Sequence, residues 1–258
     1  MIELIDLTIV PTFMLVFARI LAFLLTIPLF SYRTIPLPYR IGLAFFLSLI
    51  VTVSFPEQTL DTTIPFLVLL LKEITVGLFI GLIGYMVMSI VQIAGGFIDF
   101  QMGFAIANVI DPQTGAQSPI IGQFFYMFAI LFLLVTDGHH LLINGMLHSY
   151  HAIPLDRLLS FSGNFAEFAI VTFNRIFLIA FQISLPLVGS LFLVDVALGI
   201  IARTVPQLNV FVVGLPLKIT VSFSVLFFFM AIYIMLVKFL FQTMFEVMDQ
   251  LMLILGGG

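Results

Sequence analysis

The chain has 258 residues, of which 62% are hydrophobic and only 9% are charged, and its formal net charge is −4. A water-soluble domain devotes about a quarter of its residues to Asp, Glu, Lys and Arg, so this composition excludes a soluble globular protein. The lack of cysteine excludes disulfides and thiolate ligands, and the sparse charge provides no basic patch for nucleic acid.

Long apolar segments predict an all-α integral membrane protein. Acidic Glu3 and Asp6 precede the first segment, where a secretory signal carries Lys or Arg, so we expect a retained first helix. Pro186 and Pro216 predict kinks or helix starts, and 137–168 reads as a connection. The six apolar segments are 9–30, 41–55, 65–93, 120–136, 169–200 and 217–238.

Four ionisable side chains lie within these segments, namely Arg19, Lys72, Glu73 and Asp195. A charge at membrane depth either pairs with neighbouring helices or subunits or lines a water-filled conduit, and both interpretations stay open. Lys72 and Glu73 are adjacent in sequence, and adjacent positions of a helix point about 100° apart. We therefore expect these two side chains not to pair with each other.

Gly77 and Gly81 form a small-x-x-x-small pattern, which lets a second helix approach closely. The pattern follows no strand and no Lys-Ser/Thr accompanies it, so it does not predict a nucleotide site.

Four histidines, at positions 139, 140, 148 and 151, lie near Asp137. Imidazoles beside a carboxylate can bind zinc, but the sequence has neither an H-E-x-x-H pattern nor a cysteine. We expect hydrogen bonding at helix ends instead, and no metal or other cofactor. No G-x-S-x-G elbow is present either, so nothing in the sequence predicts an enzyme.

The C-terminal residues place Gln242, Glu246 and Asp249 along one stripe of an otherwise apolar helix. This pattern predicts an amphipathic helix that lies in a protein groove or at a membrane interface.

Two long strings of sequence resemble one known family. The first is GGFIDFQMGFAIANVIDPQTG, from Gly95 to Gly115, which TDGHHLLINGMLHSYHAIPL follows; the second is LGIIARTVPQLNVFVVGLPLK, from Leu198 to Lys218. With the N-terminal LVFARILAFLLTIPLF they resemble the FliR family, the export-gate proteins of flagellar and related type III secretion systems. The resemblance covers nearly the whole chain and is closer to flagellar than to injectisome members.

The resemblance implies a role and a set of partners. Members of this family assemble with FliP and FliQ, in the bacterial inner membrane at the flagellar basal body, into a helical gate through which unfolded flagellar proteins leave the cytoplasm. FlhB is expected to wrap the cytoplasmic entrance, and the energy comes from elsewhere in the machine. The resemblance also implies one membrane-embedded domain of long kinked helices and helical hairpins, with a FliP-like part over about 1–168 and a FliQ-like hairpin and C-terminal amphipathic helix over about 169–258.

The family signatures imply residue roles. The first signature lies at the end of a long helix, and the segment after it, 105–119, resembles a loop that plugs the closed pore. The second resembles the turn of the FliQ-like hairpin. The first matches Gly95, Gly96, Asp99, Gln101 and Gly103, and the second matches Arg203, Pro206, Gln207, Asn209, Gly214, Pro216 and Lys218.

A plug is physically consistent with this composition. Glycines and the Asp111-Pro112 pair favour backbone that need not stay helical, and non-helical backbone at membrane depth must be buried in protein or line water. Gly115 lies in the same segment. The expected apolar seal consists of Phe97, Phe100, Met102 and Phe104, and the expected hydrogen-bonding groups are Asn108, Asp111 and Gln113.

Three alternatives remain open at this point. The predicted plug, 105–119, could be an ordinary interfacial loop. The chain could also be an injectisome export-gate subunit. It could also be an ion or solute transporter that uses Arg19, Glu73, Asp99 and Asp195 as coupling residues.

Overall fold

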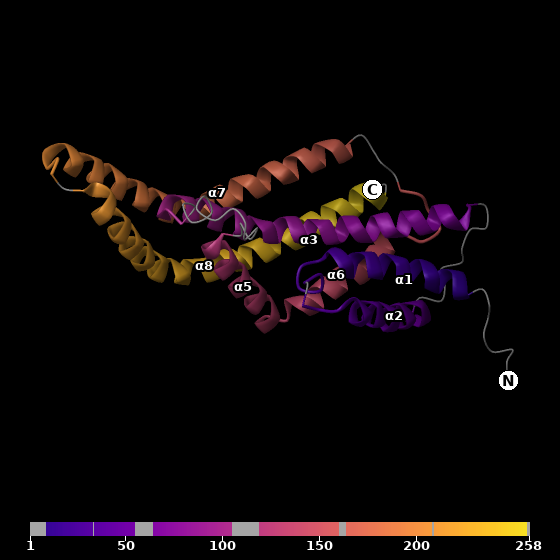
Figure 1. Ribbon diagram of the computed structural model, residues 1–258. Coiled ribbons are helices and arrows are strands. Elements are labelled where there is room, and N and C mark those ends of the chain that lie inside the picture. Colours follow the sequence, from indigo (N-terminus) through magenta and orange to yellow (C-terminus); the bar gives the residue numbers. More distant parts are fainter. Residues whose placement is uncertain are drawn as a thin grey trace. The chain divides into compact units, whose positions relative to one another are not determined.

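A computed structural model of the chain describes residues 9–32, 34–54, 64–104, 119–159, 164–207 and 209–256. Over these residues every regular element is an α-helix (Figure 1). Helices satisfy their backbone N–H and C=O groups internally, as a chain of mean hydropathy +1.27 requires in lipid. The helices are α1 (Ile9–Thr26), α2 (Leu37–Ser54), α3 (Phe66–Met102), α5 (Ile120–Val135), α6 (Gly138–Ala152), α7 (Asn164–Thr204) and α8 (Val210–Gly256).

The described residues include five helices that are long and apolar enough to cross a membrane, or six if the bent pair α5 and α6 forms one span. The predicted all-α membrane protein is therefore confirmed. Several helices exceed the predicted segments. Helix α3 has 37 residues, or about 55 Å along its axis, against a bilayer core of about 30 Å.

Pro186 and Pro216 lie inside α7 and α8, which excludes helix starts and leaves the alternative role, kinks, as a prediction. One prediction was wrong, because the expected connection 137–168 contains helix α6. This helix is the least apolar of the described helices, but Leu142, Met146 and Tyr150 are spaced four residues apart and form a buried stripe.

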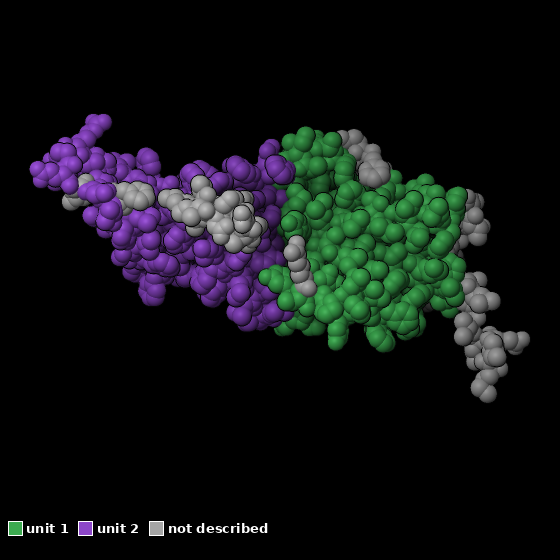
Figure 2. Space-filling model, in the orientation of Figure 1, with its two compact units in different colours: residues 1–87, 136–172, 242–258 green, residues 88–135, 173–241 purple. Residues whose placement is uncertain are grey.

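The chain folds into two compact units (Figure 2). Unit 1 consists of residues 1–87, 136–172 and 242–258, and unit 2 consists of residues 88–135 and 173–241. Each unit joins segments that are distant in sequence. The proposed division into a FliP-like and a FliQ-like part near residue 168 is a different description of the chain, and it stays a prediction.

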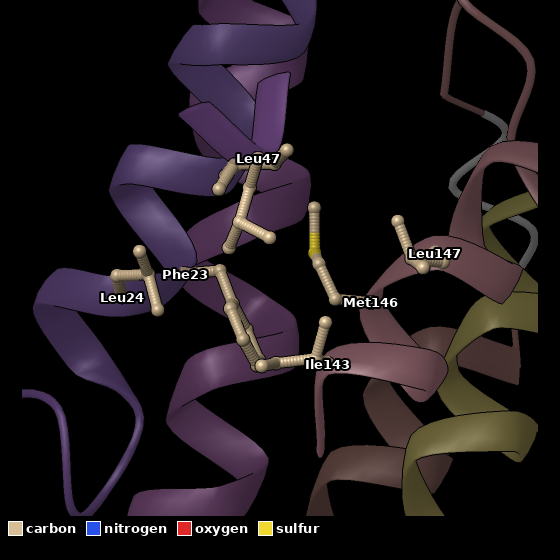
Figure 3. Close-up of a pocket in the computed structure, with 7 residues that line it drawn as sticks. Phe23, Leu24, Leu47, Ile143, Met146 and Leu147 are labelled. Carbon is tan, nitrogen blue, oxygen red and sulfur yellow. The ribbon is translucent and has the colours of Figure 1, made fainter. Parts of the chain in front are cut away.

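Close helix contacts build the core of unit 1. A Cβ atom on Gly77 would lie 2.2 Å from the carbonyl oxygen of Arg19, and one on Gly81 would lie 1.7 Å from Oγ1 of Thr26. The predicted close approach at these two glycines is thus confirmed, and α1 is the helix that approaches. Seven apolar side chains from α1, α2 and α6 line a small pocket (Figure 3) of about 10 Å³, which has no polar lining to attract a ligand.

Aromatic side chains build much of the core of unit 2. The ring of Phe125 in α5 stacks on Tyr233 in α8, with ring centroids 4.5 Å apart. The Tyr233 hydroxyl also donates a hydrogen bond to the carbonyl oxygen of Phe125. Phe97 near the end of α3 contacts Phe177 and Phe181 of α7. These contacts hold the end of α3, α5 and the α7–α8 hairpin in one unit.

Candidate functional site

The C-terminal end of α3 is fastened to the start of α5 within unit 2. A Cβ atom on Gly95 would lie 2.1 Å from Cα of Gly122, so the two backbones touch where neither residue has a side chain. Four residues further on, the buried carboxylate of Asp99 accepts a hydrogen bond from the N–H of Ile121, with both oxygens 3.2 Å from the nitrogen. N–H groups in the first turn of a helix lack intrahelical partners and favour a negative charge. Asp99 therefore caps α5 from a neighbouring helix.

Helix α3 ends in a glycine C-cap. Gly103 has φ +90°, a backbone conformation that L side chains rarely adopt. The N–H of Phe104 donates to the carbonyl of Asp99 at 3.0 Å, and the N–H of Gly103 donates to the carbonyl of Phe100 at 3.2 Å. This hydrogen-bond pair is the Schellman motif. The long helix therefore stops at Met102, directly before the predicted plug.

The four side chains expected to form an apolar seal do not share one environment. Phe97 packs on α7, Met102 is fully buried, Phe104 is half-buried and Phe100 is 75% exposed. Residues 95–102 are helical rather than irregular, which disperses these side chains around the helix. Six further predicted residues lie outside the described residues, so their placement in a plug stays a prediction; they are Asn108, Asp111, Pro112, Gln113, Gly115 and the adjoining Ala105.

The second signature occupies the turn between α7 and α8. Arg203, Pro206 and Gln207 are exposed at or after the end of α7. Asn209 precedes α8, and its side-chain oxygen accepts a hydrogen bond from the N–H of Val212 at 3.3 Å, so it caps the helix. Gly214 is buried where a Cβ atom would lie 3.1 Å from the side chain of Leu198. This glycine lets the two arms of the hairpin pack closely.

The two signatures meet at Asp195 of α7. Its carboxylate accepts a hydrogen bond from Nε2 of Gln101 at 2.8 Å and pairs with Nζ of Lys218 at 2.7 Å. Asp195, one of the four ionisable residues in the predicted apolar segments, has a side chain that is 38% exposed. It borders a groove of about 350 Å³ that is also lined by Met102, Gly103, Leu198, Gly214 and Lys218.

The buried charges of unit 1 pair with one another. Arg19 and Glu73 are both 0% exposed, and the guanidinium binds the carboxylate through Nε and through Nη2, the latter at 2.9 Å. Arg19 also donates to the carbonyl of Ser149 at 3.0 Å and to that of Ile153 at 2.8 Å, both near the end of α6. The predicted need for a partner is met by α3 and α6, inside the same unit.

Lys72 joins this cluster, contrary to expectation. Its Nζ lies 2.6 Å from Oε1 of Glu73 and 2.6 Å from the carbonyl oxygen of Pro154. The prediction that Lys72 and Glu73 do not pair was wrong, because the four-carbon stem of lysine is flexible enough to bring the ammonium back to the neighbouring carboxylate. Sequence periodicity describes where a side chain leaves the helix, and a long side chain can end elsewhere.

Comparison with known proteins identifies the family. Residues 10–244 match the family described as bacterial export proteins, family 1. The chain is 54% identical over 250 residues to the flagellar biosynthetic protein FliR of Bacillus subtilis strain 168, covering 95% of this chain and 96% of that protein. The chain belongs to the FliR family of bacterial export proteins. It is also 31% identical over 240 residues to FliR of Pectobacterium carotovorum (92% and 90% covered) and 29% identical over 231 residues to FliR of Escherichia coli K12 (89% and 88% covered).

Membership in the FliR family confirms the resemblance that the two sequence strings carried. The relatives bear the name of flagellar biosynthetic proteins, and none of these names indicates a catalytic activity.

Proposed function

We propose that the chain is a core subunit of the flagellar type III protein export gate and forms part of the channel for unfolded flagellar proteins together with FliP and FliQ. The observation that carries the proposal is the cluster of Gln101, Asp195 and Lys218. It joins the helix end that precedes the predicted plug to the predicted FliQ-like hairpin. A movement of either element therefore acts on the other.

The anchors on either side of the plug support a mechanism. The predicted plug, 105–119, lies between α3 and α5 in the sequence, and these two helices are held together by the glycine contact and by Asp99. Opening the pore then displaces the segment while its two ends stay fixed. A plug on fixed anchors returns to the same place after each substrate has passed.

The apolar exterior of the α7–α8 hairpin supports assembly with further membrane proteins. Phe227 and Phe228 are 74% and 75% exposed. In the most apolar 18-residue stretch of each helix, 17% of α7 and 22% of α8 is buried, against 44% of α3. Such faces must be covered by lipid or by other apolar helices. We propose that FliP- and FliQ-like proteins cover these faces in the bacterial inner membrane, with an FlhB-like protein at the cytoplasmic entrance.

Secretion and ion leakage test the proposal. Shortening 105–119, or replacing Gly115 with leucine, should raise the resting ion conductance of cells or alter the secretion of flagellar subunits. Gly145→Leu is the matched control, because a Cβ atom on Gly145 meets nothing within 4 Å. Variants that assemble and export normally with unchanged resting conductance would refute the plug.

A transporter that couples through Arg19, Glu73, Asp99 and Asp195 is a weaker alternative. Arg19 and Glu73 bind each other in the core of unit 1, and Asp99 caps α5, so three of these groups are engaged in holding the fold. Solute flux by the purified chain alone in liposomes would favour the transporter over the export gate.

A further inference from the structure

Three potential metal ligands gather at the turn before α6. Asp137, His139 and His140 each offer a ligand atom, and these atoms all lie within 4.8 Å of one another. The rings of His139 and His140 are 4.2 Å apart between centroids. Asp137 and His140 are exposed and His139 is half-buried, so the cluster can be reached from outside unit 1.

Helix-end hydrogen bonding, the role expected from the sequence, does not account for this cluster. Asp137 is the N-cap residue of α6, yet its carboxylate makes no capping hydrogen bond, and its φ of 54° lies in the left-handed region. An N-cap aspartate ordinarily accepts a bond from the second or third N–H of the helix. Within the described residues, Nδ1 of His139 is buried and has no hydrogen-bond partner. The buried ring nitrogen is thus left without the partner that such groups normally have, and the exposed carboxylate beside it makes no capping bond.

The donor set matches one class of ion. Two imidazole nitrogens and a carboxylate oxygen suit Zn²⁺ and similar divalent transition metals, whereas Ca²⁺ and Mg²⁺ take oxygen ligands. Zinc bonds of about 2.0–2.1 Å in tetrahedral geometry separate the ligand atoms by about 3.4 Å. Zinc binding therefore requires side-chain rotations that shorten the present spacing of up to 4.8 Å, and Asp137 and His140 are both exposed.

We propose that Asp137, His139 and His140 bind a zinc ion at the turn that precedes α6. Three protein ligands leave the fourth tetrahedral position to water or to a residue of a partner protein. The ion would tie the N-cap residue to the first turn of the helix and satisfy the buried nitrogen. This site is independent of the proposed export function.

Zinc binding by the full chain tests the proposal. The protein is purified in detergent without a polyhistidine tag, stripped with a chelator, and titrated with Zn²⁺ in competition with a fluorescent chelator. The expected result is one Zn²⁺ per chain, with affinity lowered at least about tenfold in both His140→Gln and Asp137→Asn. His148→Gln, at an exposed histidine of the same helix outside the cluster, should bind like the wild type.

A second measurement separates ligation from unfolding. Co²⁺ should give the visible absorption of a tetrahedral site in the wild type and His148→Gln but not in His140→Gln, and Zn²⁺ should raise the thermal unfolding temperature in the same two proteins only. Lack of stoichiometric zinc binding by the wild type would overturn the proposal. Unchanged binding in His140→Gln and Asp137→Asn, or equal loss in His148→Gln, would also overturn it.

Discussion

Replacing Glu73 with alanine should destabilise the protein by about 3–5 kcal/mol, the usual cost of removing one partner of a buried ion pair. The structure explains the size of the effect. Glu73 and Arg19 are 0% exposed, Lys72 is 5% exposed, and the Glu73 carboxylate is within hydrogen-bond distance of both cations. Without it, two positive charges remain buried next to each other. The carbonyls of Ser149 and Ile153 continue to accept from Arg19, but they carry no net charge to offset it.

Denaturation in detergent micelles measures this loss, and helical circular dichroism is the suitable probe because the chain has no tryptophan. Asp249→Ala is the matched control, since Asp249 is an exposed acid in unit 1. The triple replacement Arg19→Met, Lys72→Met and Glu73→Leu should cost less than Glu73→Ala alone, because it removes the buried charges together. A Glu73→Ala variant that loses no more stability than the Asp249→Ala control would refute the buried ion pair as a source of stability.

Three further predictions concern unit 2. Gly95→Ala should cost about 1–3 kcal/mol, because its Cβ atom would lie 2.1 Å from the backbone of Gly122; thermal unfolding checks this against Gly145→Ala, and equal unfolding temperatures would contradict it. Gly103→Ala should cost about 1–2 kcal/mol of stability because the φ of Gly103 is +90°. Gly96→Ala is the control and should cost little, since the nearest contact of its Cβ atom would be at 3.6 Å; equal unfolding temperatures for the two variants would show that the helix end is wrongly described. Asp195→Lys should lower the secretion of flagellar subunits by repelling Lys218, and Asp195→Lys with Lys218→Asp should restore it; a double variant as poor as the single one would rule out this ion pair as the cause.

The sequence was sufficient for most of the helices but not for their ends. Apolar runs of about 20 residues predict membrane helices, and they located most of the helices that the structure contains. The predicted apolar segment 65–93 ends nine residues before helix α3 does, because Gly95, Gly96 and Asp99 weaken the apolar pattern. Helix α3 continues through them to Met102 since Gly95 meets Gly122 and Asp99 caps α5. Both contacts come from another helix, and no local pattern reveals them.

The partners of the charged residues could not be predicted from the sequence either. Arg19 clearly needed a partner, but Glu73 lies 54 positions away and Ser149 lies 130 positions away. The meeting of Gln101, Asp195 and Lys218 likewise depends on tertiary packing, although the signatures themselves named two of the three residues. Family resemblance therefore selected the two signature segments, and the structure added which side chains they contact.

Co-purification tests the central claim most directly. The chain is co-expressed with the FliP- and FliQ-like proteins of the same bacterium, one of them carrying an affinity tag, and the purified material is sized and imaged. We predict that all three proteins elute as one particle that contains this chain. Elution of this chain by itself, together with solute flux by the lone protein in liposomes, would contradict it.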